Sequence, residues 1–149
     1  MSPQLALIRE LDVKIDQISA QQRGFVLRRL TDLFLVNEGH YSSDEIELID
    51  ELFVRLVETI EESARALLGI RLAPIASAPP RVLRLLACDD AIEVASPVLT
   101  QSEALDEETL IACSRTKSPD HLFAISQRKT MSENLTDILV KSGDQQVLL

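Results

Sequence analysis

The chain has 149 residues, 46% of them hydrophobic, which is enough to bury the core of one domain or of several repeat units. Aromatic residues make up only 3% and there are four glycines, so the composition favours helices over β-hairpins and their turns. Acidic residues outnumber basic ones by 24 to 15, giving a formal net charge of -9. A surface of that sign repels nucleic-acid phosphates and anionic lipid.

Targeting signals are missing from the sequence. No apolar run approaches the roughly 20 residues of a membrane-spanning helix, and the N-terminus MSPQLALIRELD lacks the basic-then-apolar layout of a signal peptide. Cys88 and Cys113 both lie in apolar surroundings, where reduced thiols acting as small hydrophobes are the simplest interpretation. We therefore expect a cytoplasmic protein.

Three segments in the first half of the chain have apolar residues at three- and four-residue spacing, which predicts amphipathic helices. The second starts after Ser19 and ends in NEG, where Gly39 suits a left-handed C-terminal position. Ser42 and Glu45 have the spacing of a capping box and begin the third, which we expect to break near Thr59. The apolar stripes are Leu5, Ile8, Leu11, Ile15 and Ile18; Val26, Leu27, Leu30, Leu33 and Phe34; and Ile46, Ile49, Leu52, Phe53, Leu56 and Ile60, continued by Ala64, Leu67 and Leu68.

The run PIASAPP interrupts this pattern, because three prolines in seven residues cannot remain helical. The helical segments after it are shorter. We therefore divide the chain into an N-terminal helical bundle (1–73), a Pro-rich linker (74–80) and a C-terminal region of short helices (81–149).

The C-terminal region resembles a repeat. DDAIEVA (89–95), SPDHLFA (118–124) and SGDQQVL (142–148) each open with an Asp or Ser that could cap a helix, and each has an apolar sixth residue. Each also follows another apolar segment: PRVLRLLA, DEETLIACS and SENLTDILV, respectively. Two helices per repeat is the organisation of an α-solenoid. We predict an all-α fold in which the N-terminal bundle continues into HEAT-like antiparallel helix-pair repeats.

Asp89 and Asp90 could be a reactive carboxylate pair or the start of a helix. The other two units have Ser118 and Ser142 at the place of Asp89, and a serine could cap a helix but could not share acid–base work. We therefore predict that Asp89 is the N-cap of the following helix and that Asp90 adds favourable negative charge at the same helix end.

The runs LACDDAIEVASPVL, LDEETLI and AISQRKTMSENLTDILVKSGD resemble a bacterial family catalogued as domain of unknown function 2336, over roughly residues 80–149. The resemblance implies HEAT-type helical repeats and supplies no activity or site residue. Family members are generally longer, and the chain ends about one turn after Ser142 on apolar residues. We therefore expect the repeats to be truncated at the C-terminus, in the N-terminal part of a longer bacterial protein.

The usual signatures of chemistry are not found. The possible metal ligands Cys88, Cys113, His40 and His121 lack ligand spacing, and neither a nucleophile motif nor a Gly-rich phosphate loop occurs. We expect His40 in an inter-helix turn and His121 facing solvent. The prediction is a non-enzyme with no catalytic, cofactor-binding or metal-ligating residue.

The predicted function is a protein–protein interaction scaffold whose partner carries a basic patch. One alternative is a structural module that self-associates through its N-terminal helices. A third, less favoured because of the acidic charge, is a HEAT-like nucleic-acid-binding or repair protein. The candidate partner-binding surface consists of Arg115, Lys117, His121, Gln127, Arg128 and Lys129.

Overall fold

A computed structural model describes residues 3–147 and places the side chains of residues 5–142. Its regular structure within that range is entirely helical, which confirms the all-α class. None of the described helices is long and apolar enough to cross a membrane. The helices are α1 (Pro3–Lys14), the 3-10 helix η1 (Ile15–Gln17), α2 (Ala20–Val36), α3 (Ser43–Val57), α4 (Glu62–Leu72), α5 (Pro80–Ala87), α6 (Ile92–Gln101), α7 (Glu107–Thr116), α8 (Pro119–Ser126) and α9 (Glu133–Val147).

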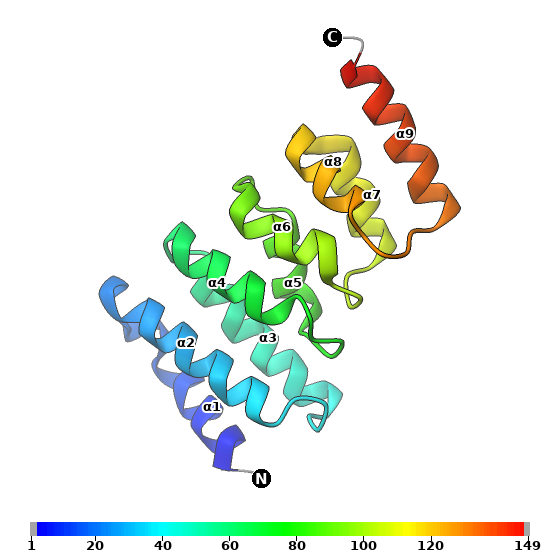
Figure 1. Ribbon diagram of the computed structural model, residues 1–149. Coiled ribbons are helices and arrows are strands. Elements are labelled where there is room, and N and C mark those ends of the chain that lie inside the picture. Colours follow the sequence, from blue (N-terminus) through cyan, green and yellow to red (C-terminus); the bar gives the residue numbers. More distant parts are fainter. Residues whose placement is uncertain (1–2, 148–149) are drawn as a thin grey trace.

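The helices form two layers. The even-numbered helices α2, α4, α6 and α8 contact one another in order, and the odd-numbered helices α1, α3, α5, α7 and α9 do the same. Figure 1 shows the helices following one another along a single direction, with the two ends of the chain at opposite ends of the stack.

One hydrophobic core runs between the layers, and it extends from Ile8 in α1 to Leu135 in α9. It includes Ala73 and Ala78 in the non-helical segment between α4 and α5, so the buried cluster is continuous across the predicted linker. Ile8 and Ile15 of the stripe predicted for the first helix belong to this core, and Leu5 is also buried. Burial of this apolar surface is the main force that holds the layers together.

Several local predictions are confirmed. Ser42 caps α3 in a capping box, in which the Glu45 N–H donates to Ser42 Oγ (3.2 Å) and the Ser42 N–H donates to Glu45 Oε1 (2.8 Å). Gly39 has φ +84°, the left-handed conformation, in the turn that follows α2. Ser118 caps α8, whose first residue is Pro119. The long apolar stripe breaks between α3 and α4, as expected.

The prediction that Asp89 is an N-cap is wrong. Helix α6 begins at Ile92 and its N-cap is Ala91. Asp89 lies one turn earlier, where its Oδ1 accepts the Ala91 N–H at 3.0 Å and its Oδ2 binds Arg65 Nε at 2.8 Å. An aspartate often forms such a bond to the backbone two residues on. The residue is structural, but it closes the turn before the helix.

This error shifts the predicted repeat by two residues. Aligned at their helix starts, Val94 of α6 matches His121 of α8, since each is the third residue of its helix. Both are buried, whereas Phe123, predicted to match Val94, is 67% exposed. Residues at the same distance from the start of their helices are therefore the ones with equivalent burial.

The third predicted unit does not begin at Ser142. Helix α9 runs without interruption from Glu133 to Val147, so Ser142 and Gly143 lie inside it, while the Val147 side chain is outside the described residues. An internal glycine costs a helix only about 1 kcal/mol relative to alanine, which the rest of the helix can offset. The hydroxyl at the start of this helix belongs to Ser132, which accepts the Leu135 N–H at 3.1 Å.

Helix α5 is capped by a residue from another helix. Its own N-cap, Pro79, has no side-chain acceptor. The carboxylate of Asp50, buried in α3, instead accepts the N–H groups of Arg81 (2.9 Å) and Val82 (2.8 Å). Because the first N–H groups of a helix have no partner within it, this contact satisfies α5 and fixes it to α3.

Helices α4 and α6 approach each other closely at Gly69. A Cβ atom there would lie 2.9 Å from the carbonyl oxygen of Val94, whereas one at Gly24 in α2 would meet nothing within 4 Å. We predict that Gly69→Ala lowers the free energy of unfolding by about 1–3 kcal/mol, because the helices must separate. Gly24→Ala should raise it by about 0.5–1 kcal/mol, the ordinary gain in helix propensity. Urea denaturation measures the free energy of unfolding of both variants. Equal values for Gly69→Ala and Gly24→Ala would contradict the close approach of the helices at Gly69.

Candidate functional site

The polar residues near Asp89 join three successive inter-helix turns. Arg65 donates from Nη1 to the Ile60 carbonyl at 2.7 Å as well as binding the Asp89 carboxylate, so it connects the α3–α4 turn with the α5–α6 turn. His121 Nε2 lies 2.8 Å from the Asp89 carbonyl oxygen and its Nδ1 lies 2.6 Å from Ser118 Oγ, which adds the α7–α8 turn. The contacts of Arg65, Asp89 and His121 thus connect these three turns to one another.

His121 was predicted to face solvent, and that prediction is wrong: its side chain is only 1% exposed. Both nitrogens of the buried ring have polar partners, Ser118 Oγ and the Asp89 carbonyl oxygen, which makes burial of the imidazole possible. Lys117 also makes a contact within the chain. Its Nζ lies 2.8 Å from Asp90 Oδ1, and this contact lowers the pKa of the Asp90 carboxyl.

Arg128 is held in the structure as well. Its Nη1 and Nη2 donate to the carbonyls of Leu99 (2.6 Å) and Ser102 (2.5 Å), at the C-terminal end of α6. These carbonyls have no partners within the helix, and a cation there is favoured by the helix dipole. Burial lowers the pKa of the guanidinium.

The remaining members of the predicted surface are exposed: Arg115 near the end of α7, and Gln127 and Lys129 after α8. The six candidate residues therefore divide between the two ends of α8. An eight-residue helix is about 12 Å long, so the two groups are separated by that length. The structure does not bring them together in one cluster.

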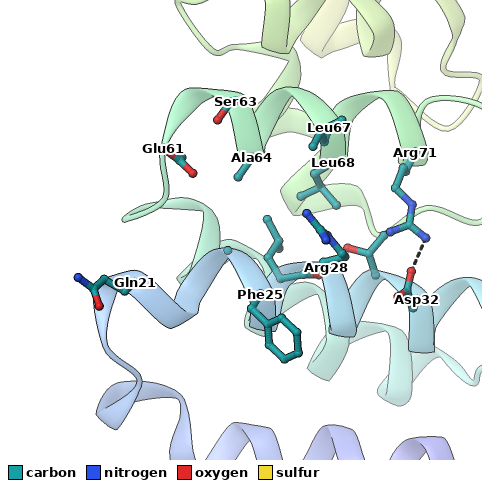
Figure 2. Close-up of a pocket in the computed structure, with 13 residues that line it drawn as sticks. Gln21, Phe25, Arg28, Asp32, Glu61, Ser63, Ala64, Leu67, Leu68 and Arg71 are labelled. Atoms are coloured by element: carbon teal, nitrogen blue, oxygen red, sulfur yellow. Dashed lines mark hydrogen bonds and ion pairs between the residues drawn. The ribbon is translucent and has the colours of Figure 1, made fainter.

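A cavity of about 580 Å³ lies between α2 and α4. We call it the α2–α4 groove. Leu27 and Leu68 are buried beneath it, while Phe25 is 71% and Leu67 is 55% exposed. Figure 2 shows Leu68 directed from α4 toward α2, with Arg28 between the two helices.

The two ends of the groove differ. At one end Arg71 Nη2 binds Asp32 Oδ1 at 2.6 Å, an ion pair that joins α4 to α2 (dashed line in Figure 2). Gln21 and Glu61 lie at the other end, which no such ion pair closes among the described residues. Arg28 is exposed and makes no ion pair within the described part of the chain. The groove thus combines exposed apolar atoms with hydrogen-bond donors.

Sequence reasoning missed this groove. The apolar periodicity places Leu67 on the buried stripe of a helix, and Phe25 lies outside the stripe that begins at Val26. The available signal was the scarcity of aromatic residues. Of the four phenylalanines, Phe34 and Phe53 are fully buried and contact each other edge to face, whereas Phe25 and Phe123 are exposed.

The structural role of Arg128 can be tested by comparison with its exposed neighbour Lys129. Arg128→Met removes both donors to the end of α6, and we predict a loss of about 1–3 kcal/mol in the free energy of unfolding, because two carbonyls lose their partners. Lys129→Met should change it by less than about 0.5 kcal/mol, since that side chain is exposed. Chemical denaturation of the two variants measures this difference. A stable Arg128→Met protein would return Arg128 to the set of residues free to bind a partner.

Comparisons with known proteins bear on the C-terminal half. Neither the curated proteins nor the solved structures contain a significant match to the chain. Residues 94–149 match a family described as "Uncharacterised protein conserved in bacteria (DUF2336)". This confirms the resemblance found in the sequence, and from Val94 onward the chain is similar to that bacterial family.

Proposed function

We propose that the chain is a non-enzymatic protein-interaction module, built as a HEAT-like α-solenoid of antiparallel helix pairs. Support comes from the contacts of each helix with the next one of its own layer, and from the side chains that connect equivalent turns. In such a stack each unit contacts only its neighbours, and the extended surface is available for a partner.

The observation that carries the proposal is the exposed apolar surface of the α2–α4 groove. Phe25 is 71% and Leu67 is 55% exposed, although the chain buries its other groove leucines. Burying a large apolar side chain contributes about 1.5–3 kcal/mol, and aromatic residues are prominent among those that dominate protein interfaces. A partner that covers these two residues would gain this energy.

The partner we propose is a protein segment with an apolar anchor residue and flanking basic residues. The anchor would lie against Phe25 and Leu67, and Arg28 is free to donate to carbonyls of the bound segment. The net charge of -9, together with Glu61 at the open end of the groove, favours approach of a basic segment.

The test compares two exposed phenylalanines. We expect Phe25→Asp to reduce capture of the partner from a native lysate at least tenfold, because a charge replaces an apolar contact worth more than about 1.4 kcal/mol. Phe123→Asp is the matched control, since Phe123 is similarly exposed but lies in α8, and it should capture the partner as the original chain does. Capture is quantified by mass spectrometry.

Two outcomes would contradict the proposal. Equal capture by all three chains would exclude the groove as the docking surface, and a captured protein whose binding does not weaken with added salt would exclude the basic segment. The surface predicted from the sequence is tested in the same experiment by Arg115→Glu with Lys129→Glu. Arg128 is left unchanged because it holds the end of α6.

A further inference from the structure

The two cysteines of the chain lie against each other. Cys88 follows the last residue of α5 and Cys113 is in α7, the next helix of the same layer. Their Sγ atoms are 3.4 Å apart, and both thiols are free. Since a disulfide has an S–S distance of about 2.05 Å, the pair would need only a small movement to form one.

The surroundings of the two sulfurs differ. Cys88 is half-buried and borders a second cavity of about 320 Å³, which Arg81 and Arg84 also line, whereas Cys113 is only 1% exposed. A small reagent can therefore reach Cys88 from solvent, while Cys113 is reached from the side of Cys88. Arg81 and Arg84 place positive charge on the wall of this cavity, which Glu58 also lines.

The hydrogen bond between the thiols also makes them chemically unequal. The hydrogen-bonding contact with Cys113 lowers the pKa of the Cys88 thiol to about 6; the charges of Lys117 and Arg84 act in the same direction, and burial and Asp106 oppose it. The same contact and burial raise the pKa of the Cys113 thiol. A cysteine is nucleophilic as its thiolate, so Cys88 is the reactive partner at neutral pH.

We propose that Cys88 and Cys113 form a reversible oxidation site, in which Cys88 reacts with a hydroperoxide and Cys113 resolves the product to a disulfide. The Cys88 thiolate attacks the outer oxygen of the hydroperoxide, the O–O bond breaks and the alkoxide leaves as an alcohol after taking a proton. Cys88 is then a sulfenic acid. Cys113 attacks its sulfur, the S–O bond breaks and water leaves. The two sulfurs have together lost two electrons, and a cellular thiol can reverse the reaction by exchange.

The oxidised form would covalently join α5 and α7. It would close a loop that contains α6, so oxidation should stabilise this part of the stack against unfolding. Asp90 has a supporting role, because its ion pair holds the ammonium of Lys117 beside the thiols.

The experiment exposes the folded chain to one equivalent of hydrogen peroxide at neutral pH, followed by quenching and intact mass measurement. We expect the loss of two hydrogen atoms, a Cys88–Cys113 peptide under non-reducing conditions, and a return to the original mass with dithiothreitol. Cys113→Ala should instead leave a sulfenic acid on Cys88 that a dimedone probe traps. In Cys88→Ala the buried Cys113 should remain unmodified.

A second measurement does not depend on the peroxide. The pH midpoint for alkylation of Cys88 by iodoacetamide should lie near 6 in the original chain, and in Cys113→Ala it should move up toward the value of about 8.5 for an ordinary thiol. Circular dichroism checks that each variant is folded. The proposal is overturned if the folded chain forms no disulfide, if the disulfide forms only in denaturant, or if the two alkylation midpoints coincide.

Discussion

The ends of helices leave backbone N–H and C=O groups without partners, and in this chain several of the partners are side chains from elsewhere in the fold. Asp50 accepts the first N–H groups of α5 from its place in α3, and Arg128 donates to the last carbonyls of α6 from beyond α8. Arg65 and His121 connect three turns through Asp89. A buried polar group without a partner costs about 1–3 kcal/mol, so each of these contacts ties one helix pair to the next in a defined position.

The same constraint accounts for contacts made by the residues that look reactive in the sequence. An aspartate pair, a histidine and an arginine are usual constituents of active sites; here Asp89, His121 and Arg128 hold turns or a helix end, and the exposed Asp90 forms an ion pair with Lys117. The two features proposed for function are an exposed apolar surface and a pair of thiols. Phe25 and Leu67 are apolar and exposed beside a groove, and Cys88 borders a cavity with its thiol against that of Cys113.

The two proposed sites belong to different layers. The α2–α4 groove is in the layer of even-numbered helices, whereas the cysteines join two odd-numbered helices. They also depend on different physics, since the groove relies on apolar area and steering by net charge, and the cysteines rely on a hydrogen bond and nearby cations. The failure of either proposal would therefore leave the other standing.

The amino-acid sequence by itself determined the features that depend on neighbours within about one helical turn. The apolar stripes, the capping box of Ser42, the left-handed Gly39 and the non-helical run around PIASAPP are of this kind, because each contact involved spans only a few residues. The wrongly predicted N-cap at Asp89 shows the limit of prediction from local sequence. A helix start at Asp89 moves the repeat by two residues and gives Phe123 the place that His121 occupies in the structure.

Only the tertiary structure decided the contacts that join distant parts of the chain. The Asp89 carboxylate could bond the following helix or Arg65, 24 residues earlier, and nothing in the local pattern distinguishes the two. The same holds for the 3.4 Å between Cys88 and Cys113, and for Phe25, which lies beside a core stripe yet remains exposed. The period of a helix tells which residues share a face, but which faces meet, and which are left uncovered, depends on how the helices pack.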